Sequence, residues 1–193
     1  MCIRDRPLDI TTLAVLCPTA GKLSKASKSA GTLPSYLSIN PNAKAPAIED
    51  NGHVVFDSNA ILLYLAEKTG KFLPTDSLES KSKLYSWLMF VATGIGPYSG
   101  QSVHFQHMAP EKIKYAINRY TYEAERHYNI LNNRLEKNEY MLGNTYTVVD
   151  MAVWGWTRMI EKVIAVGELD KRKNLKRLMD YILSLIHISE PTR

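Results

Sequence analysis

Hydrophobic and polar positions alternate over two short runs in the first half of the chain, on either side of Asn51-Gly52. Asn and Gly tolerate the positive φ angles of a two-residue hairpin turn. The pattern therefore predicts antiparallel strands over Ala45–Glu49 and His53–Phe56. Pro46 lacks an N–H group and belongs at the start or edge of a strand.

The pattern then changes to helical spacing, which continues until Gly70, a residue common just past a helix end. Asp57 and Ser58 precede the first apolar position and are suited to cap a helix. We therefore predict a short amphipathic helix from Asn59, with its apolar side formed by Ile61, Leu62, Tyr64 and Leu65.

No further strand is predicted after Leu73-Pro74, so we place a domain boundary near Thr75 to Glu79. Apolar spacing predicts helices over Ser80–Val91, from near Pro110, from Thr147 and over Leu175–Ile182. Thr93 to Gly100, with Pro97, should break or kink the chain. Thr147 and Asp150 have the spacing of a capping box. The long helix that starts near Pro110 should bury a stripe of residues along one side, formed by Ile113, Ile117, Tyr120, Ala124, Tyr128 and Leu131.

The start of the helix after the hairpin is a candidate binding site. Its first turn carries free N–H groups and partial positive charge, so Ser58 and its neighbours could hold a carboxylate while Asp57 pairs with an ammonium. Together they would suit an α-amino acid. The alternative is that both residues serve as helix caps and nothing more.

The same region resembles the signature of the glutathione transferase superfamily, N-P-x-x-K-x-P-A-[LIV] followed by [ED]-S-x-A-I-x-x-Y-L. The two matching segments are Asn40–Ile48 and Asp57–Leu65. The resemblance implies that Pro46 is cis and that the backbone of Ala45 pairs with the cysteinyl unit of glutathione. It also implies that Asp57 and Ser58 hold the γ-glutamyl end. The family more often has Glu where this chain has Asp57.

Further segments resemble the bacterial nu class, which are glutathione-dependent disulfide reductases. In that class the arginine of an A-I-x-R-Y stretch helps to bind glutathione, and Arg119 has this position. A guanidinium suits a carboxylate. The alternative is a solvated charge or an ion pair with Glu123, one turn later. The segments are Trp87–Phe90, Gly94–Pro97, Gly100–Gln101, Ala109–Ile113 and Ala116–Tyr120.

Composition indicates an ordinary globular protein, with 193 residues, 45% hydrophobic and 22% charged. No apolar run reaches the length of about 18 residues that a membrane span needs, so we expect a cytoplasmic protein without a membrane partner. Two cysteines form no disulfide framework. The net charge of +5 would favour an anionic ligand. The basic cluster over 171–177 is interpreted as a solvated helix face, so no nucleic acid is expected.

Both ends of the chain resemble translated sequencing-adapter DNA. Met1–Arg6 can be back-translated to contain ATGTGTATAAGAGACAG, and Leu183–Ile188 to contain its reverse complement. We therefore expect 1–6 and 183–193 to be assembly artefacts and exclude them from fold reasoning. Sequencing the source locus tests this: the hypothesis fails if genomic DNA continues through both ends unchanged.

Pro7 to Ala30 matches the superfamily poorly, because too little chain precedes Pro41 for the expected strands, helix and catalytic turn. Cys17 and Thr19 lie in a segment with a faint likeness to the nu-class turn T-P-N-G-x-K. We name them as weak catalytic candidates, against the alternative of a loop in a truncated stretch. Gly31 stands where the nu class has a glutathione-contacting Gln.

Other chemistry-bearing residues are expected to have structural roles. His104 and His107 could share a metal, but no Cys or acid joins them at ligand spacing, so no metal site is predicted. Trp87, Trp154 and Trp156 are expected in the core. Tyr98 is a candidate for the electrophile side of the site.

These observations predict an incomplete thioredoxin-like domain (7–76) followed by an all-helical domain (77–182). The resemblance implies a glutathione-dependent transferase or disulfide-bond reductase that acts through the glutathione thiolate. Its second substrate would be a small electrophile or disulfide. The full-length protein would be a homodimer. The alternatives are a non-catalytic binding or regulatory module, and an inactive truncated fragment.

Overall fold

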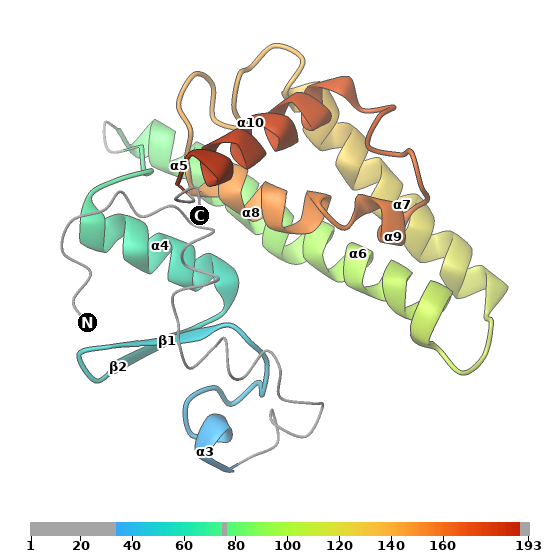
Figure 1. Ribbon diagram of the computed structural model, residues 1–193, viewed down its shortest axis with the longest axis horizontal. Coiled ribbons are helices and arrows are strands. Elements are labelled where there is room, and N and C mark those ends of the chain that lie inside the picture. Colours follow the sequence, from blue (N-terminus) through green and yellow to red (C-terminus); the bar gives the residue numbers. More distant parts are fainter. Residues whose placement is uncertain (1–33, 75–76, 190–193) are drawn as a thin grey trace. The chain divides into compact units, whose positions relative to one another are not determined.

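The computed structural model describes residues 34–74 and 77–189 (Figure 1). Within them, 34–69 and 70–184 belong to two compact units, each described here by itself. The sequence-based predictions for 1–33, including Cys17, Thr19 and Gly31, lie outside the described residues.

The N-terminal unit contains a β-hairpin between two helices. Its elements are α3 (Pro34–Leu37), β1 (Ala47–Asp50), β2 (His53–Phe56) and α4 (Ser58–Thr69). The strands are antiparallel and in register from Ala47 opposite Phe56 to Asp50 opposite His53. Asn51 and Gly52 have φ angles of 53° and 81°, which confirms the predicted turn.

The hairpin begins later than predicted, at Ala47 rather than Ala45. The Ala45-Pro46 peptide bond is cis, as the resemblance implied. Because Pro46 has no N–H group to donate, the paired ladder starts at the following residue. The second strand has the predicted bounds, and α4 begins at Ser58, next to the predicted start.

Helices make up the described part of the C-terminal unit, which ends at Ser184 within the last of them. In chain order they are α5 (Leu78–Phe90), η2 (Val91–Ile95), α6 (Gly96–Val103), η3 (His104–Met108), α7 (Lys114–Arg134), α8 (Val148–Thr157), α9 (Ile160–Val163) and α10 (Lys173–Ser189). A thioredoxin-like part is thus followed by an all-helical domain, as predicted from the sequence.

Of the break or kink predicted between Thr93 and Gly100, the break is absent, because the helical winding changes there instead. The chain passes from α5 through the π-helical turn η2 into α6 without leaving helical geometry. Pro97 lies in the first turn of α6, where a missing N–H is tolerated. A second π-helical turn, η3, follows α6. Such turns are often found at functional sites.

The long helix α7 starts at Lys114, so Pro110 is not its first-turn proline as predicted. Ile113 precedes the helix with an extended backbone (φ −85°, ψ 95°) and is 46% exposed, so it does not join the buried stripe. The later members of that stripe, Ala124, Tyr128 and Leu131, are fully buried.

The capping box of α8 is confirmed, because Thr147 and Asp150 satisfy each other's backbone groups. The last helix starts at Lys173 and continues to Ser189, beyond its predicted end at Ile182. None of Trp87, Trp154 and Trp156 is fully buried, against their predicted core positions. The largest fully buried side chains instead include Tyr128, Leu88, Ile95, Leu131, Leu135 and Met141.

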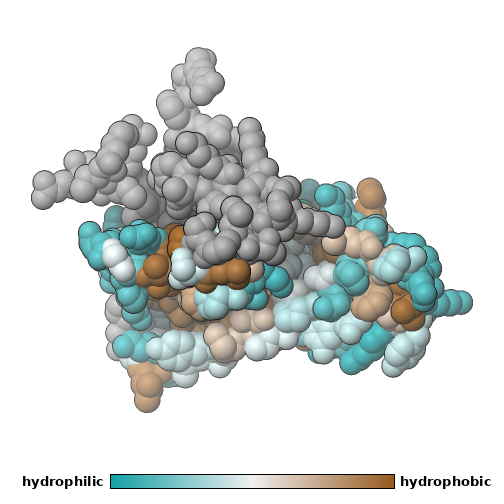
Figure 2. Space-filling model, turned by 90° about the horizontal axis from the view of Figure 1, so that it is seen from below, coloured by the Kyte–Doolittle hydropathy of each residue, from teal (hydrophilic) through white to brown (hydrophobic). Residues whose placement is uncertain are grey.

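No helix within 34–74 and 77–189 is long and apolar enough to cross a membrane. On the face shown in Figure 2, hydrophobic and hydrophilic residues lie in small intermixed groups.

Candidate functional site

The loop that carries Ala45 and Pro46 is fixed by two side chains that the sequence analysis did not single out. Tyr36 donates its hydroxyl to the carbonyl oxygen of Lys44 at 2.8 Å, and the Asn40 amide donates to the same oxygen. Asn40, which is buried, also accepts a hydrogen bond from the Asn42 N–H at 2.9 Å. The asparagine and tyrosine together therefore hold the backbone immediately before Ala45.

Ala45 itself is exposed, and its backbone groups have no hydrogen-bond partner among the described residues. A free N–H and C=O next to a paired strand can bind the backbone of an extended peptide. The geometry is therefore compatible with the predicted role of Ala45, and Pro46 sets the direction of the chain at this point.

Asp57 connects β2 to α4 with a φ angle of 74°, in the left-handed region. Its Oδ1 atom accepts hydrogen bonds from the N–H groups of Asn59 (2.9 Å) and Ala60 (3.2 Å). The capping role considered for Asp57 is therefore present. Its second carboxylate oxygen, Oδ2, has no partner in the described part of the chain and remains available to a cation.

Ser58 is exposed at the first position of α4. Asp57 takes two of the N–H groups of the first turn, so fewer remain for a ligand than the sequence suggested. The hydroxyl and N–H of Ser58 have no partner among the described residues. An oxygen acceptor next to helix N–H donors can bind the two charged groups of an α-amino acid.

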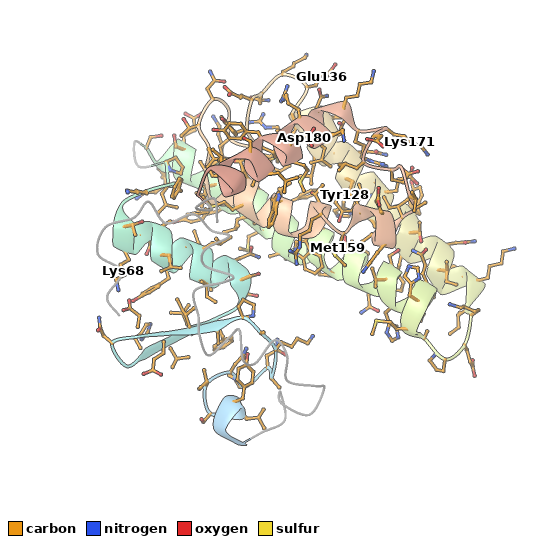
Figure 3. All side chains as sticks on the ribbon, viewed as in Figure 1. Lys68, Tyr128, Glu136, Met159, Lys171 and Asp180 are labelled. Carbon is orange, nitrogen blue, oxygen red and sulfur yellow. The ribbon has the colours of Figure 1, made fainter. Side chains whose placement is uncertain are left out.

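A polar cluster ties α4 to the hairpin. Asp50 accepts a hydrogen bond from the Tyr64 hydroxyl at 2.6 Å and another from the Lys68 ammonium. Lys68 lies on α4 (Figure 3). The hydrogen bond from Lys68, followed by that from Tyr64, lowers the pKa of Asp50. The His53 ring lies 5.8 Å from the ring of Tyr64. This cluster therefore stabilises the position of α4 on the strands.

Arg119 belongs to the C-terminal unit, whereas Ala45, Pro46, Asp57 and Ser58 all belong to the N-terminal unit. It lies on α7, and its Nη1 donates to Glu123 Oε1 at 2.6 Å. The predicted alternative, an ion pair with Glu123, is therefore present. Its side chain is 47% exposed, so the remaining N–H groups can reach a ligand.

The two histidines considered as metal ligands have other contacts. His107 Nε2 lies 2.9 Å from the carbonyl oxygen of Lys162, and the His104 ring packs edge-on against Phe105. Among the described residues no group of three or more His, Cys, Asp or Glu side chains could hold a metal ion. Tyr98 lies with its ring 5.0 Å from that of His127.

The basic cluster over 171–177 is largely paired with other groups of the protein. Lys171 and Arg172 bind Glu168, and Lys176 binds Asp170. Arg177 donates to the carbonyl oxygens of Leu135 and Asn138. The prediction of one solvated helix face is therefore wrong in part, because Arg172 is 4% exposed and both Lys171 and Arg172 precede α10, which begins at Lys173.

The chain has a thioredoxin-like part with a hairpin, a cis proline, and a helix whose start carries Asp57 and Ser58. An all-helical domain follows this part. Residues 23–67 match the family model "Glutathione S-transferase, N-terminal domain", and 87–185 match "Glutathione S-transferase, C-terminal domain". The chain belongs to the glutathione S-transferase family.

Two curated relatives come from Escherichia coli. Disulfide-bond oxidoreductase YfcG is 45% identical over 130 residues, which are 64% of this chain and 60% of that protein. Disulfide-bond oxidoreductase YghU is 44% identical over 126 residues, 63% of this chain and 43% of that protein. The chain therefore spans less than two thirds of the length of each.

A glutathione transferase from Burkholderia graminis has a similar solved structure, with two glutathione molecules bound per subunit. The TM-score is 0.72 at 30% identity, and the match covers 86% of this chain and 75% of that protein.

Proposed function

We propose that the protein binds glutathione and reduces disulfide bonds through the glutathione thiolate. The observation that carries the proposal is the start of α4, where Asp57 caps the helix with one oxygen and leaves the other available beside Ser58. The oxidoreductase names of the two E. coli relatives favour disulfide reduction as the reaction.

The ligand contacts follow from the chemistry of glutathione. Its γ-glutamyl end carries an ammonium, which Asp57 Oδ2 would bind, and a carboxylate, which Ser58 and the helix N-terminus would bind. Ala45 would pair with the peptide backbone of the cysteinyl unit. Arg119 would bind a carboxylate.

The reaction balances with two glutathione molecules. The thiolate of the first attacks one sulfur of the substrate disulfide, which forms a mixed disulfide and releases one substrate thiolate. The second glutathione attacks the glutathione sulfur of that mixed disulfide and releases the other substrate thiolate. The products are oxidised glutathione and two substrate thiols, so no protein cysteine is required. Cys17 and Thr19 remain weak candidates for activating the thiol.

Conjugation of the same thiolate to a small electrophile is the second candidate reaction, and a non-catalytic binding module is the alternative without chemistry. Turnover assays distinguish the three functions. A reductase consumes a disulfide, a transferase conjugates glutathione to an electrophile, and a binding module binds glutathione without either reaction. The expected homodimer and cytoplasmic location also remain proposals. Light scattering of the purified full-length protein and fractionation of its source cells test them.

Asp57→Asn separates the capping role from the binding role. Asn keeps an oxygen acceptor for the helix and tolerates positive φ, but it lacks the charge that attracts an ammonium. We expect about tenfold weaker glutathione binding by calorimetry and a matching loss of disulfide turnover, because charge-assisted hydrogen bonds are the stronger ones. Glu67→Gln, which removes an exposed charge from the other end of α4, is the control.

Two outcomes would contradict the proposal. If the unmodified protein does not bind glutathione, the proposed function is wrong. If it does bind and Asp57→Asn binds equally well, Asp57 is a helix cap alone and the ammonium is held elsewhere.

A further inference from the structure

The segment that follows α4 holds an aromatic residue in a strained backbone conformation. Phe72 has a φ angle of 65°, in the left-handed region. A bulky side chain is rarely found there, because its Cβ atom lies too close to the backbone. Asn51 and Asp57 also have positive φ angles, but their side-chain types tolerate that conformation. Among residues 34–74 and 77–189, Phe72 is the one aromatic residue with a positive φ.

Two contacts hold Phe72 in place, and both are made to the start of α8. Its carbonyl oxygen accepts a hydrogen bond at 3.1 Å from the N–H of Val148, the first residue of that helix. N–H groups of a first helical turn have no acceptor within their own helix. The Phe72 ring packs edge-on against Tyr146, with ring centroids 5.9 Å apart. All three residues belong to the C-terminal unit.

The ring that receives Phe72 is itself fixed by two other tyrosines. The centroid of the Tyr146 ring lies 5.7 Å from that of Tyr140 and 6.3 Å from that of Tyr181. Tyr140 is buried, and Tyr181 comes from α10. Edge-on contacts of this kind are favourable between aromatic rings. The half-buried Phe72 ring therefore packs against a preformed aromatic cluster.

The contributions at Phe72 oppose one another. The left-handed backbone costs free energy, whereas the hydrogen bond to Val148, the ring contact and the buried apolar area favour the observed position. These contributions are of similar size, so the observed position is favoured by a small margin. Such a segment opens locally while the rest of the unit stays folded. On opening, Phe72 returns to an ordinary backbone conformation and the Val148 N–H binds water.

We propose that Phe72 is a strained latch that closes residues 70–74 onto the start of α8. When the latch is closed, the chain is fixed three residues after the end of α4 at Thr69. When it is open, residues 70–74 are free to move. The latch therefore decides whether the segment that leaves α4 is ordered. The inference concerns contacts within the C-terminal unit and does not depend on the proposed function.

Cleavage by trypsin after Lys71 measures the opening. Lys71 is exposed and directly precedes Phe72, and a protease needs a mobile segment. We expect Phe72→Ala to be cut there about tenfold faster than the unmodified protein, because the ring contact is lost and the strain remains. Phe72→Gly loses the same ring but is unstrained at this φ, so it should be cut more slowly than Phe72→Ala. Mass spectrometry identifies the fragment that ends at Lys71.

Val148→Pro tests the hydrogen bond by itself. Proline suits the first position of a helix, and Thr147 before it already has the extended backbone that proline requires (φ −138°, ψ 175°). The variant removes the N–H group that Phe72 accepts. Val148→Ala is the matched control, because it also loses the buried side chain but keeps the N–H. We expect Val148→Pro to be cut after Lys71 about fivefold faster than Val148→Ala.

Hydrogen exchange of single amides gives a local readout. In Phe72→Ala the Val148 amide should exchange about tenfold faster than in the unmodified protein, because its acceptor moves away. The Met151 amide donates to the Thr147 carbonyl oxygen within the same helix, so its exchange should not change.

Three results would overturn the latch. The first is cleavage of Phe72→Ala after Lys71 no faster than that of the unmodified protein, or slower than that of Phe72→Gly. The second is equal cleavage of Val148→Pro and Val148→Ala, since the hydrogen bond would then hold nothing. The third is faster exchange of the Val148 and Met151 amides together, which would mean that α8 as a whole has loosened. No glutathione is present in these measurements, so such a failure leaves the proposed function untouched.

Discussion

Gly94 stands where a methyl group would overlap the ring of His127. A Cβ atom added there would lie 2.5 Å from His127 Nε2. The glycine belongs to the π-helical turn η2, and the imidazole beside it donates through Nδ1 to the backbone carbonyl oxygen of Glu123. The missing side chain at Gly94 therefore leaves room for the buried ring of His127.

We expect Gly94→Ala to lower the free energy of unfolding by about 1 to 3 kcal/mol, because the added atom overpacks a buried ring. Gly100→Ala is the matched control, since an added Cβ meets no atom within 4 Å there. It should be neutral or stabilising by up to about 1 kcal/mol through helix propensity. Urea denaturation measures both. Equal stability of the two variants would show that His127 moves aside at little cost.

At Asp57 and Arg119 the structure contains the local alternative that the sequence posed, and the ligand-binding role of each stays a proposal. Asp57 does cap α4, and Arg119 does pair with Glu123, yet each keeps hydrogen-bonding capacity beyond that contact. Capping and ion pairing between neighbouring turns are local interactions, so sequence spacing was enough to predict them. Glu123 is 7% exposed, and the spacing of residues along α7 did not predict that burial.

At the scale of elements, α8 depends on a buried cap. Asp150 accepts hydrogen bonds from the N–H groups of Met141 (2.7 Å) and Thr147 (2.9 Å), and from the Thr147 hydroxyl (3.1 Å). It is fully buried. The Asp150 carboxylate thus accepts hydrogen bonds both from the residue that caps α8 and from the loop before it.

We expect Asp150→Ala to destabilise the protein by about 2 to 4 kcal/mol, because it leaves three buried donors without an acceptor. Ser77→Ala provides a comparison, since Ser77 caps the exposed start of α5 with one hydrogen bond. That change should cost about 1 kcal/mol. Denaturation midpoints measure the difference. Similar losses in both variants would mean that the Asp150 contacts add nothing beyond an ordinary cap.

Burial raises the pKa of Asp150 from 3.8 to about 6, although the hydrogen bonds that the carboxylate accepts from Met141 and Thr147 act to lower it. The folded state therefore holds this proton more tightly than the unfolded chain does. The resulting stability is fully present below pH 3.8 and is lost as the pH rises through about 6.

Unfolding of the unmodified protein and of Asp150→Asn should be compared across that range. We expect the stability of the unmodified protein relative to the variant to fall as the pH rises, because the variant cannot titrate there. Groups that both proteins share cancel in the difference. A rise with pH would show that the three donors outweigh burial.

At the scale of the whole molecule, the C-terminal unit contains the largest fully buried side chains, Leu131 and Tyr128 of α7 among them. We expect Leu131→Ala to destabilise this unit by about 2 to 5 kcal/mol, through lost apolar burial and the cavity left behind. Leu78→Ala, at a position that is 82% exposed, should change stability by less than about 0.5 kcal/mol.

Circular dichroism during thermal unfolding measures both variants, because the helical unit provides most of the signal. If Leu131→Ala melted like the unmodified protein, α7 would not be part of a cooperative core.

The sequence by itself determined the hairpin, the helix caps and the family signature. Turn residues, caps and the motif around Pro46 act through backbone geometry within a few residues, so their effect can be predicted from spacing. Tertiary structure alone decided that the chain continues through η2 and η3 without a break, that α7 begins after Pro110, and that Glu123, which pairs with Arg119 and Arg126, is buried. These features depend on packing between residues far apart in the chain. The spacing of residues along one segment does not predict that packing.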